Sequence, residues 1–184
     1  MILYLLTKRK SIGTMAMTLL KPTLTFSVFK EIQKIKDIQM EPVSERLKIV
    51  LASVFSFYLK AHYFHWNVTG PNFSEYHKFF EQIYSDAHAS VDAYAEHIRV
   101  LGAYAPGSLN RMAELTSIQD IDTIPLGIDM IRILEADNGV LITELYAARE
   151  YADAAGQYGV VNFLEERIDA HEKLRWMLKS FRGS

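Results

Sequence analysis

Residues 65–73 read His-Trp-Asn-Val-Thr-Gly-Pro-Asn-Phe, a turn between two long segments that have the spacing of helices. Before the turn, apolar residues recur at intervals of three and four positions from Val43 onward. This periodicity predicts a long helix that ends near His65 or Trp66. The residues between that helix end and Pro71 then form the turn itself.

The segment after the turn has the signals of a second long helix. Asn72 and Glu75 have the spacing of a capping box, and Gly102 can end the helix in a left-handed cap. A long connection follows as far as Pro125, with one short turn of helix expected over 109–115. So long a connection favours the ferritin-type arrangement, in which the second and third helices are joined across the bundle.

Two more long helices are predicted in the C-terminal half. They run from about Leu126 to Ala154 and from about Tyr158 to Phe181, and Gly156 and Gly159 separate them. The predicted fold class is therefore all-α. It is a ferritin-like four-helix bundle with a short extra helix in the long crossover between helices two and three.

The N-terminal part is interpreted as a tail and a short helix. Residues 1–22 are expected to be flexible, and residues 23–184 to form a single ferritin-like domain. A separate short helix is predicted over Ser27–Ile38. Pro42 then suits the first turn of the next helix, with Ser44 as its cap.

Composition limits the function classes. The 184 residues include no cysteine, so there is no thiolate cluster, disulfide or thiol nucleophile, and any metal must be held by nitrogen and oxygen. The absence of cysteine fits a reducing, cytoplasmic compartment. The apolar run Met1 to Leu6 is too short to cross a bilayer, so neither secretion nor a membrane location is expected.

Charge bears on nucleic-acid binding. The net charge of −2 lacks the overall basic character of a nucleic-acid binder. The tail nevertheless carries Lys8, Arg9, Lys10 and Lys21. The tail is either a disordered extension without a partner or a mobile arm that contacts DNA phosphates. In the second case the protein would bind DNA and be located at the nucleoid.

Four potential metal ligands share one face of the second helix. His77 and Glu81, the first pair, are four residues apart, as are Asp92 and Glu96, the second pair. The rotation between Glu81 and Asp92 returns to within roughly 20° of the same face, so all four lie on one stripe. The two pairs are, however, roughly 16 Å apart along the axis, too far for one metal centre.

A second copy of the chain resolves this separation. If two such helices cross antiparallel near Asp86 and Ala87, the first pair of one chain comes opposite the second pair of the other. A two-fold axis makes the same pairing twice, which predicts two equivalent sites per dimer. His65, at the end of the preceding helix, can complete each site.

The mixed donor set indicates the kind of metal. Imidazole with carboxylate favours iron, zinc or manganese, and open coordination positions would permit redox turnover of Fe(II). None of the six histidines has an acidic residue three positions before it, so the Glu-x-x-His signature of a centre inside one bundle is missing. The alternative interpretation is a solvated helix face with histidines in structural roles.

The sequence resembles the Dps family, the DNA-binding proteins from starved cells, also called miniferritins. The resemblance covers roughly residues 26–181, and its most specific element is the His-Trp-Asn-Val-x-Gly-x-x-Phe motif with spaced acids behind it. The matching positions are residues 62–73, His77, Glu81, Asp92, Ala95, Glu96, Leu101, Gly102, residues 162–167, residues 171–173 and residues 176–178.

The resemblance implies a hollow dodecamer of four-helix subunits. Such proteins oxidise Fe(II), commonly with hydrogen peroxide, and deposit Fe(III) inside, at ferroxidase centres on two-fold interfaces. By position, the ligands from one subunit correspond to His65, His77 and Glu81, and those from its neighbour to Asp92 and Glu96. Trp66 corresponds to a tryptophan that packs beside the centre.

Three departures from the family pattern affect the site. Position 81 is commonly Asp and is Glu here, and His97 replaces a usual Arg that forms a salt bridge. Gln157 and Asn162 are neutral where the family often places acids that line a three-fold pore. The route by which iron enters is therefore left unassigned.

Other polar residues are interpreted as structural. His62, His88 and His171 belong to this group, with extra metal binding as the alternative, and Asp137 is an ordinary position on the third helix. Tyr94 is interpreted as a packing residue. Two functions stand: a ferroxidase and iron store that protects against peroxide, and a DNA-compacting or structural cage whose metal site is weak or vestigial.

Overall fold

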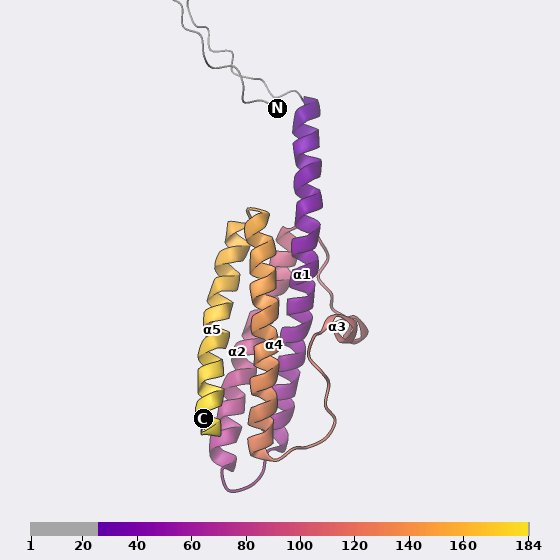
Figure 1. Ribbon diagram of the computed structural model, residues 1–184. Helices are drawn as coiled ribbons and strands as arrows, with labels where there is room; N and C mark the ends of the chain where they lie inside the picture. Colours follow the sequence, from indigo (N-terminus) through magenta and orange to yellow (C-terminus); the bar gives the residue numbers. More distant parts are fainter. Residues whose placement is uncertain (1–25, 184) are drawn as a thin grey trace, which may run out of the picture.

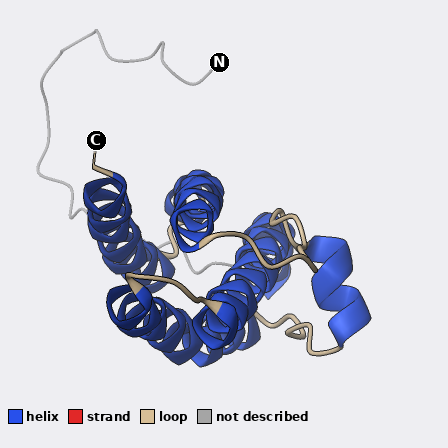
Figure 2. Ribbon diagram, turned by 90° about the horizontal axis from the view of Figure 1, so that it is seen from below, coloured by secondary structure: helices blue, strands red, loops and turns tan. Residues whose placement is uncertain are grey.

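The computed structural model describes residues 26–183, with side chains from Val43 onward. Within this part the chain forms α1 (Phe26–Asn67), α2 (Phe73–Val100), α3 (Leu109–Leu115), α4 (Gly127–Ala154) and α5 (Tyr158–Arg182). Four long helices lie side by side, and α3 lies outside them (Figures 1 and 2). The predicted all-α, ferritin-like bundle with a short helix in the crossover is confirmed.

The crossover determines the topology of the bundle. After α2 the chain passes α3 and returns along the length of the bundle, so that α4 runs in the same direction as α2 (Figure 1). Helix α1 packs against α2, α3 and α4, and α5 packs against α4. In the described part of the chain, no helix is long and apolar enough to cross a membrane.

The prediction for the start of α1 is wrong. No separate helix over Ser27–Ile38 exists, because α1 is one continuous helix that passes through Pro42 and extends beyond the bundle (Figure 1). Ser44 therefore lies inside the helix and is not its cap. Proline has a helical φ and removes one hydrogen bond, so a helix continues through it where both flanks favour helix. The predicted tail boundary at residue 22 and the basic tail residues lie outside the described part.

The ends of α2 agree with the prediction in position. Asn72 is the residue before α2, but its side chain forms no capping hydrogen bond, so the predicted capping box is not made. Gly102 has φ +84°, in the left-handed region that glycine adopts without a Cβ clash, as the sequence predicted.

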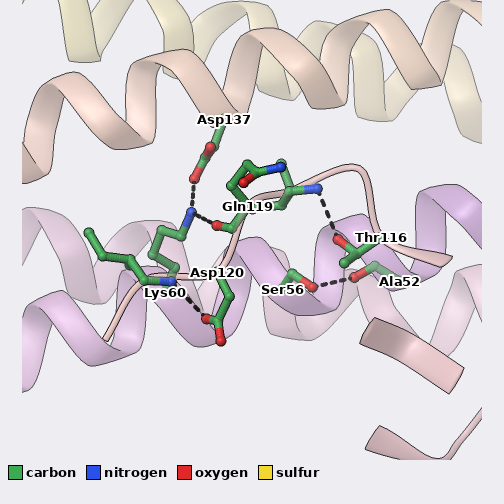
Figure 3. Close-up of polar contacts among 9 residues, drawn as sticks. Ala52, Ser56, Lys60, Thr116, Gln119, Asp120 and Asp137 are labelled. Carbon is green, nitrogen blue, oxygen red and sulfur yellow. Dashed lines mark hydrogen bonds and ion pairs between the residues drawn. The ribbon is translucent and has the colours of Figure 1, made fainter. Parts of the chain in front are cut away.

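A buried ion pair attaches the crossover to the bundle. The Lys60 ammonium donates to Asp137 Oδ2 and to the carbonyl of Gln119, both at 2.6 Å (Figure 3). Burial raises the pKa of Asp137, and the hydrogen bond and charge of Lys60 oppose that rise. Asp137 is therefore not the ordinary helix position that the sequence indicated. It is the buried counter-ion of a lysine on α1.

Candidate metal centre

Two of the predicted ligands come together where α1 ends and α2 begins. His65 Nδ1 lies 2.8 Å from the carbonyl oxygen of His77, and His77 Nδ1 lies 2.9 Å from that of His65. The two rings are stacked with centroids 3.7 Å apart. Because a carbonyl only accepts, each Nδ1 carries the proton and donates, which leaves the lone pair of each Nε2 for a ligand. This reciprocal pairing orients both imidazoles as metal-binding histidines are usually oriented.

The three predicted carboxylates lie on the outer face of α2. Glu81, Asp92 and Glu96 are exposed, and none forms an ion pair or hydrogen bond with another described residue. The opposite face of the helix supplies the core, through Phe79, Phe80, Ile83, Ala87, Ser90, Tyr94 and Ile98. The carboxylates therefore point away from the bundle, toward any molecule that covers α2.

A single chain does not bring all five residues together. Among the side chains from Val43 to Gly183, no group of three His, Asp or Glu residues lies close enough to hold a metal ion. Helix α2 is continuous from Phe73 to Val100, so Asp92 and Glu96 remain roughly 16 Å along the axis from the first pair. The structure thus joins His65 with His77. The shared centre with a second chain stays a prediction.

Among the described residues, the interior of the bundle offers no alternative centre. Two cations, the Lys60 ammonium and the Arg167 guanidinium, are buried there; Arg167 forms an ion pair with Asp86. Asn138 forms hydrogen bonds of 2.7 and 2.9 Å with Nδ1 and with the carbonyl of His171, whose Nε2 has no partner among the described residues. Buried positive charges and committed donors disfavour a cation. This agrees with the missing Glu-x-x-His signature.

Aromatic rings surround the two histidines. Tyr84, which the sequence analysis did not single out, has its ring 5.1 Å from that of His65 and stacked at 4.0 Å on that of His62. Its seven-residue spacing from His77 on one helix face could have indicated this. Trp66 is 60% exposed, and its ring lies 4.2 Å from His62. That Trp66 packs beside an iron centre stays a prediction.

Two pKa shifts mark residues next to the centre. Burial lowers the pKa of His62, and the charges of His65 and His88 lower it further. Burial also lowers the pKa of His97, whose ring packs 4.5 Å from that of Phe163. Within the described residues His97 forms no ion pair with Glu96, so the salt bridge expected of an arginine at this position is missing.

The comparisons with known proteins agree with this geometry. A profile of the ferritin-like domain matches residues 44–183. A DNA protection during starvation protein from Brevibacillus brevis is 34% identical over 124 residues, which cover 67% of this chain and 83% of that protein. A low temperature-induced protein from Nostoc sp. is 31% identical over 150 residues, or 79% and 82% of the two chains.

Solved structures show the same likeness. A Dps protein from Bacillus brevis superimposes with a TM-score of 0.75 at 31% identity, over 78% of this chain and 96% of that one. The Dps protein from Vibrio cholerae O1 superimposes with a TM-score of 0.75 at 29% identity, over 79% of this chain and 91% of that one. It is described as a member of a broad superfamily of ferritin-like diiron-carboxylate proteins. The chain therefore belongs to the Dps family of ferritin-like proteins.

Proposed function

We propose that this protein is a ferroxidase and iron-storage subunit that oxidises Fe(II) and keeps Fe(III) inside a hollow oligomer, expected to be a dodecamer. One observation carries the proposal: His65 and His77 orient each other with both Nε2 lone pairs free, on the face where three carboxylates have no partner among the described side chains. The Vibrio cholerae relative, described as a diiron-carboxylate protein, supports iron as the substrate.

The proposed centre uses two subunits. His65, His77 and Glu81 of one chain meet Asp92 and Glu96 of its two-fold partner when the α2 helices cross antiparallel near their middle. The imidazoles hold Fe(II), and the hard carboxylate oxygens favour Fe(III). Zinc or manganese would fit the same donors.

The proposed oxidant is hydrogen peroxide. Two Fe(II) ions each give one electron, the O–O bond of one peroxide molecule breaks, and two protons complete two water molecules. Two-electron reduction of peroxide in this way releases no hydroxyl radical, so the reaction would protect the cell and its DNA.

DNA binding through the tail is the alternative function, and the name of the Brevibacillus brevis relative supports it. The basic residues that would contact phosphate lie outside the described part of the chain. A mobility-shift assay at low salt tests this prediction, since phosphate contacts are strongest there. No shift at micromolar oligomer would remove it. A cytoplasmic or nucleoid location also stays a prediction.

Ferroxidation is tested by adding Fe(II) without oxygen and then peroxide, and by following the ferric absorbance. We expect the His65→Ala/His77→Ala variant to lose the fast phase while native mass spectrometry shows an intact oligomer. His88→Ala, which removes an exposed histidine of α2 that is not among the proposed iron ligands, is the matched control and should keep the wild-type rate. An unchanged rate in the double variant would contradict the assignment.

Sharing between subunits is tested by complementation. Chains with His65→Ala/His77→Ala and chains with Asp92→Ala/Glu96→Ala should each be inactive alone. In a mixed dimer one centre carries both defects and the other carries none, so random mixing should restore about a quarter of the wild-type activity. Mixed oligomers without activity would rule out the shared centre.

A further inference from the structure

Two histidines on the outer face of α1 and α2 have no role in the proposed iron centre. His62 is stacked on Tyr84, and its Nδ1 is buried with no hydrogen-bond partner in the described part of the chain. His88 is exposed on α2, and its ring lies 4.9 Å from that of Tyr58. The Tyr58 ring is also 5.7 Å from that of His62. The two imidazoles therefore flank one tyrosine.

The proposed crossing of the α2 helices determines where the partner's residues lie. It places the partner's His88 opposite Ser85, the neighbour of Tyr84. Because His62 is stacked on Tyr84, the partner's His88 then comes close to His62. The two copies of residue 88 are then three positions apart, about 4.5 Å along the helix axis. Both chains thus bring two imidazoles to the two-fold axis.

The chemistry near the axis differs from that of the iron centre. Asp86, the carboxylate nearest the crossing point, is engaged by the Arg167 guanidinium of its own chain. Imidazole nitrogen is then the main donor available, with few carboxylates to favour iron. Such a set suits Zn²⁺ or Cu²⁺. In the described part of the chain no hydrogen bond engages His62 Nδ1, so a small shift of the ring stacked on Tyr84 would make this nitrogen available to an ion.

We propose that His62 and His88, with the same residues of the two-fold partner, bind one Zn²⁺ or Cu²⁺ ion on the dimer axis, separate from the two iron centres. This site rests on the proposed two-fold pairing of α2. An ion held by both chains would stabilise the dimer, because it binds the paired state and not the separate chains.

Zinc binding is measured by equilibrium dialysis of the whole oligomer in the His65→Ala/His77→Ala background, which lacks the imidazoles of the iron centre. We expect one tightly bound Zn²⁺ for every two chains. Adding His88→Ala removes a direct ligand, so it should weaken zinc binding at least as much as the loss of an outer-shell partner does, which is roughly tenfold. Adding His97→Ala, the matched control, should leave it unchanged. With Cu²⁺ as the probe, the nitrogen hyperfine splitting in the paramagnetic resonance spectrum should lose the contribution of two imidazoles with His88→Ala, and an unchanged splitting pattern would contradict the site.

The outcomes separate this site from the proposed function. His88→Ala alone should keep the wild-type rate of Fe(II) oxidation. If mixed oligomers regain activity but neither His88→Ala nor His62→Ala changes the zinc affinity, the axial site alone would be overturned. Failure of the complementation, or a monomeric native mass, would overturn the iron centre and the axial site together.

Discussion

Acid should destabilise this fold through His171, a buried histidine on α5. The residue is 2% exposed, and its Nδ1 donates to Asn138 Oδ1 at 2.7 Å. Its Nε2 is buried without a hydrogen-bond partner among the described residues. Burial, together with the charge of Arg167, lowers the pKa of His171 from 6.5 to about 4, while the charge of Asp86 opposes this shift. The folded chain therefore keeps this imidazole neutral at a pH where an unfolded chain would protonate it.

The size of the effect follows from the two pKa values. Above pH 6.5 the imidazole is neutral in both states, and its contribution to stability is fully present. As the pH falls from 6.5 to about 4, the unfolded chain takes up a proton that the folded chain does not. A pKa shift of this size, at 1.36 kcal/mol per unit, lowers the free energy of unfolding by roughly 3 kcal/mol.

The assay is urea unfolding of the wild type and of His171→Leu over this pH range at one fixed protein concentration. The variant leaves Asn138 Oδ1 unpaired, which shifts its stability at every pH, so the informative quantity is the slope against pH. We expect the wild type to lose roughly 3 kcal/mol more than the variant between pH 6.5 and 4. His88→Ala, which removes an exposed histidine, should behave as the wild type does. Parallel curves for wild type and His171→Leu would refute the reasoning.

Two further stability predictions use the same unfolding assay. Lys60→Met leaves Asp137 as a buried charge without its counter-ion and should lower the free energy of unfolding by about 3–5 kcal/mol. Adding Asp137→Leu to this variant should recover most of that loss. A double variant no more stable than the single one would contradict this account. Gly127→Ala places a Cβ 2.7 Å from the Tyr76 ring and should cost about 1–3 kcal/mol. Gly139→Ala, in the same helix with open space around it, should gain roughly 1 kcal/mol, and equal effects at both glycines would refute the steric account.

Local signals made most of the fold predictable from sequence. Gly102 and Gly156 have positive φ at the ends of α2 and α4, and the expected short helix agrees with Leu109–Leu115. Turn residues act on their own neighbourhood, so a single sequence reports them. Pro42 misled for the same reason. Its local preference for a first turn was overridden by a helix that continues on both sides.

Contacts between distant residues were not predictable. Nothing near Asp137 in the sequence indicates that Lys60, on another helix, supplies its counter-ion. The exchange of hydrogen bonds between His65 and His77 likewise depends on the path of the turn, although both residues were predicted to be ligands. Helical periodicity reports which face a residue occupies, and it does not report what packs against that face.

The core residues and the predicted metal ligands of α2 lie on opposite faces of the helix. Its buried face, with Tyr94 and Ile98, packs into the bundle, whereas Glu81, Asp92 and Glu96 form no ion pair with the side chains described from Val43 onward. Pairing two chains through the outer face would bring these carboxylates near one another, and like charges repel. A bound cation relieves that repulsion and lowers the free energy of the dimer. Assembly and iron binding are therefore thermodynamically linked in the proposed centre.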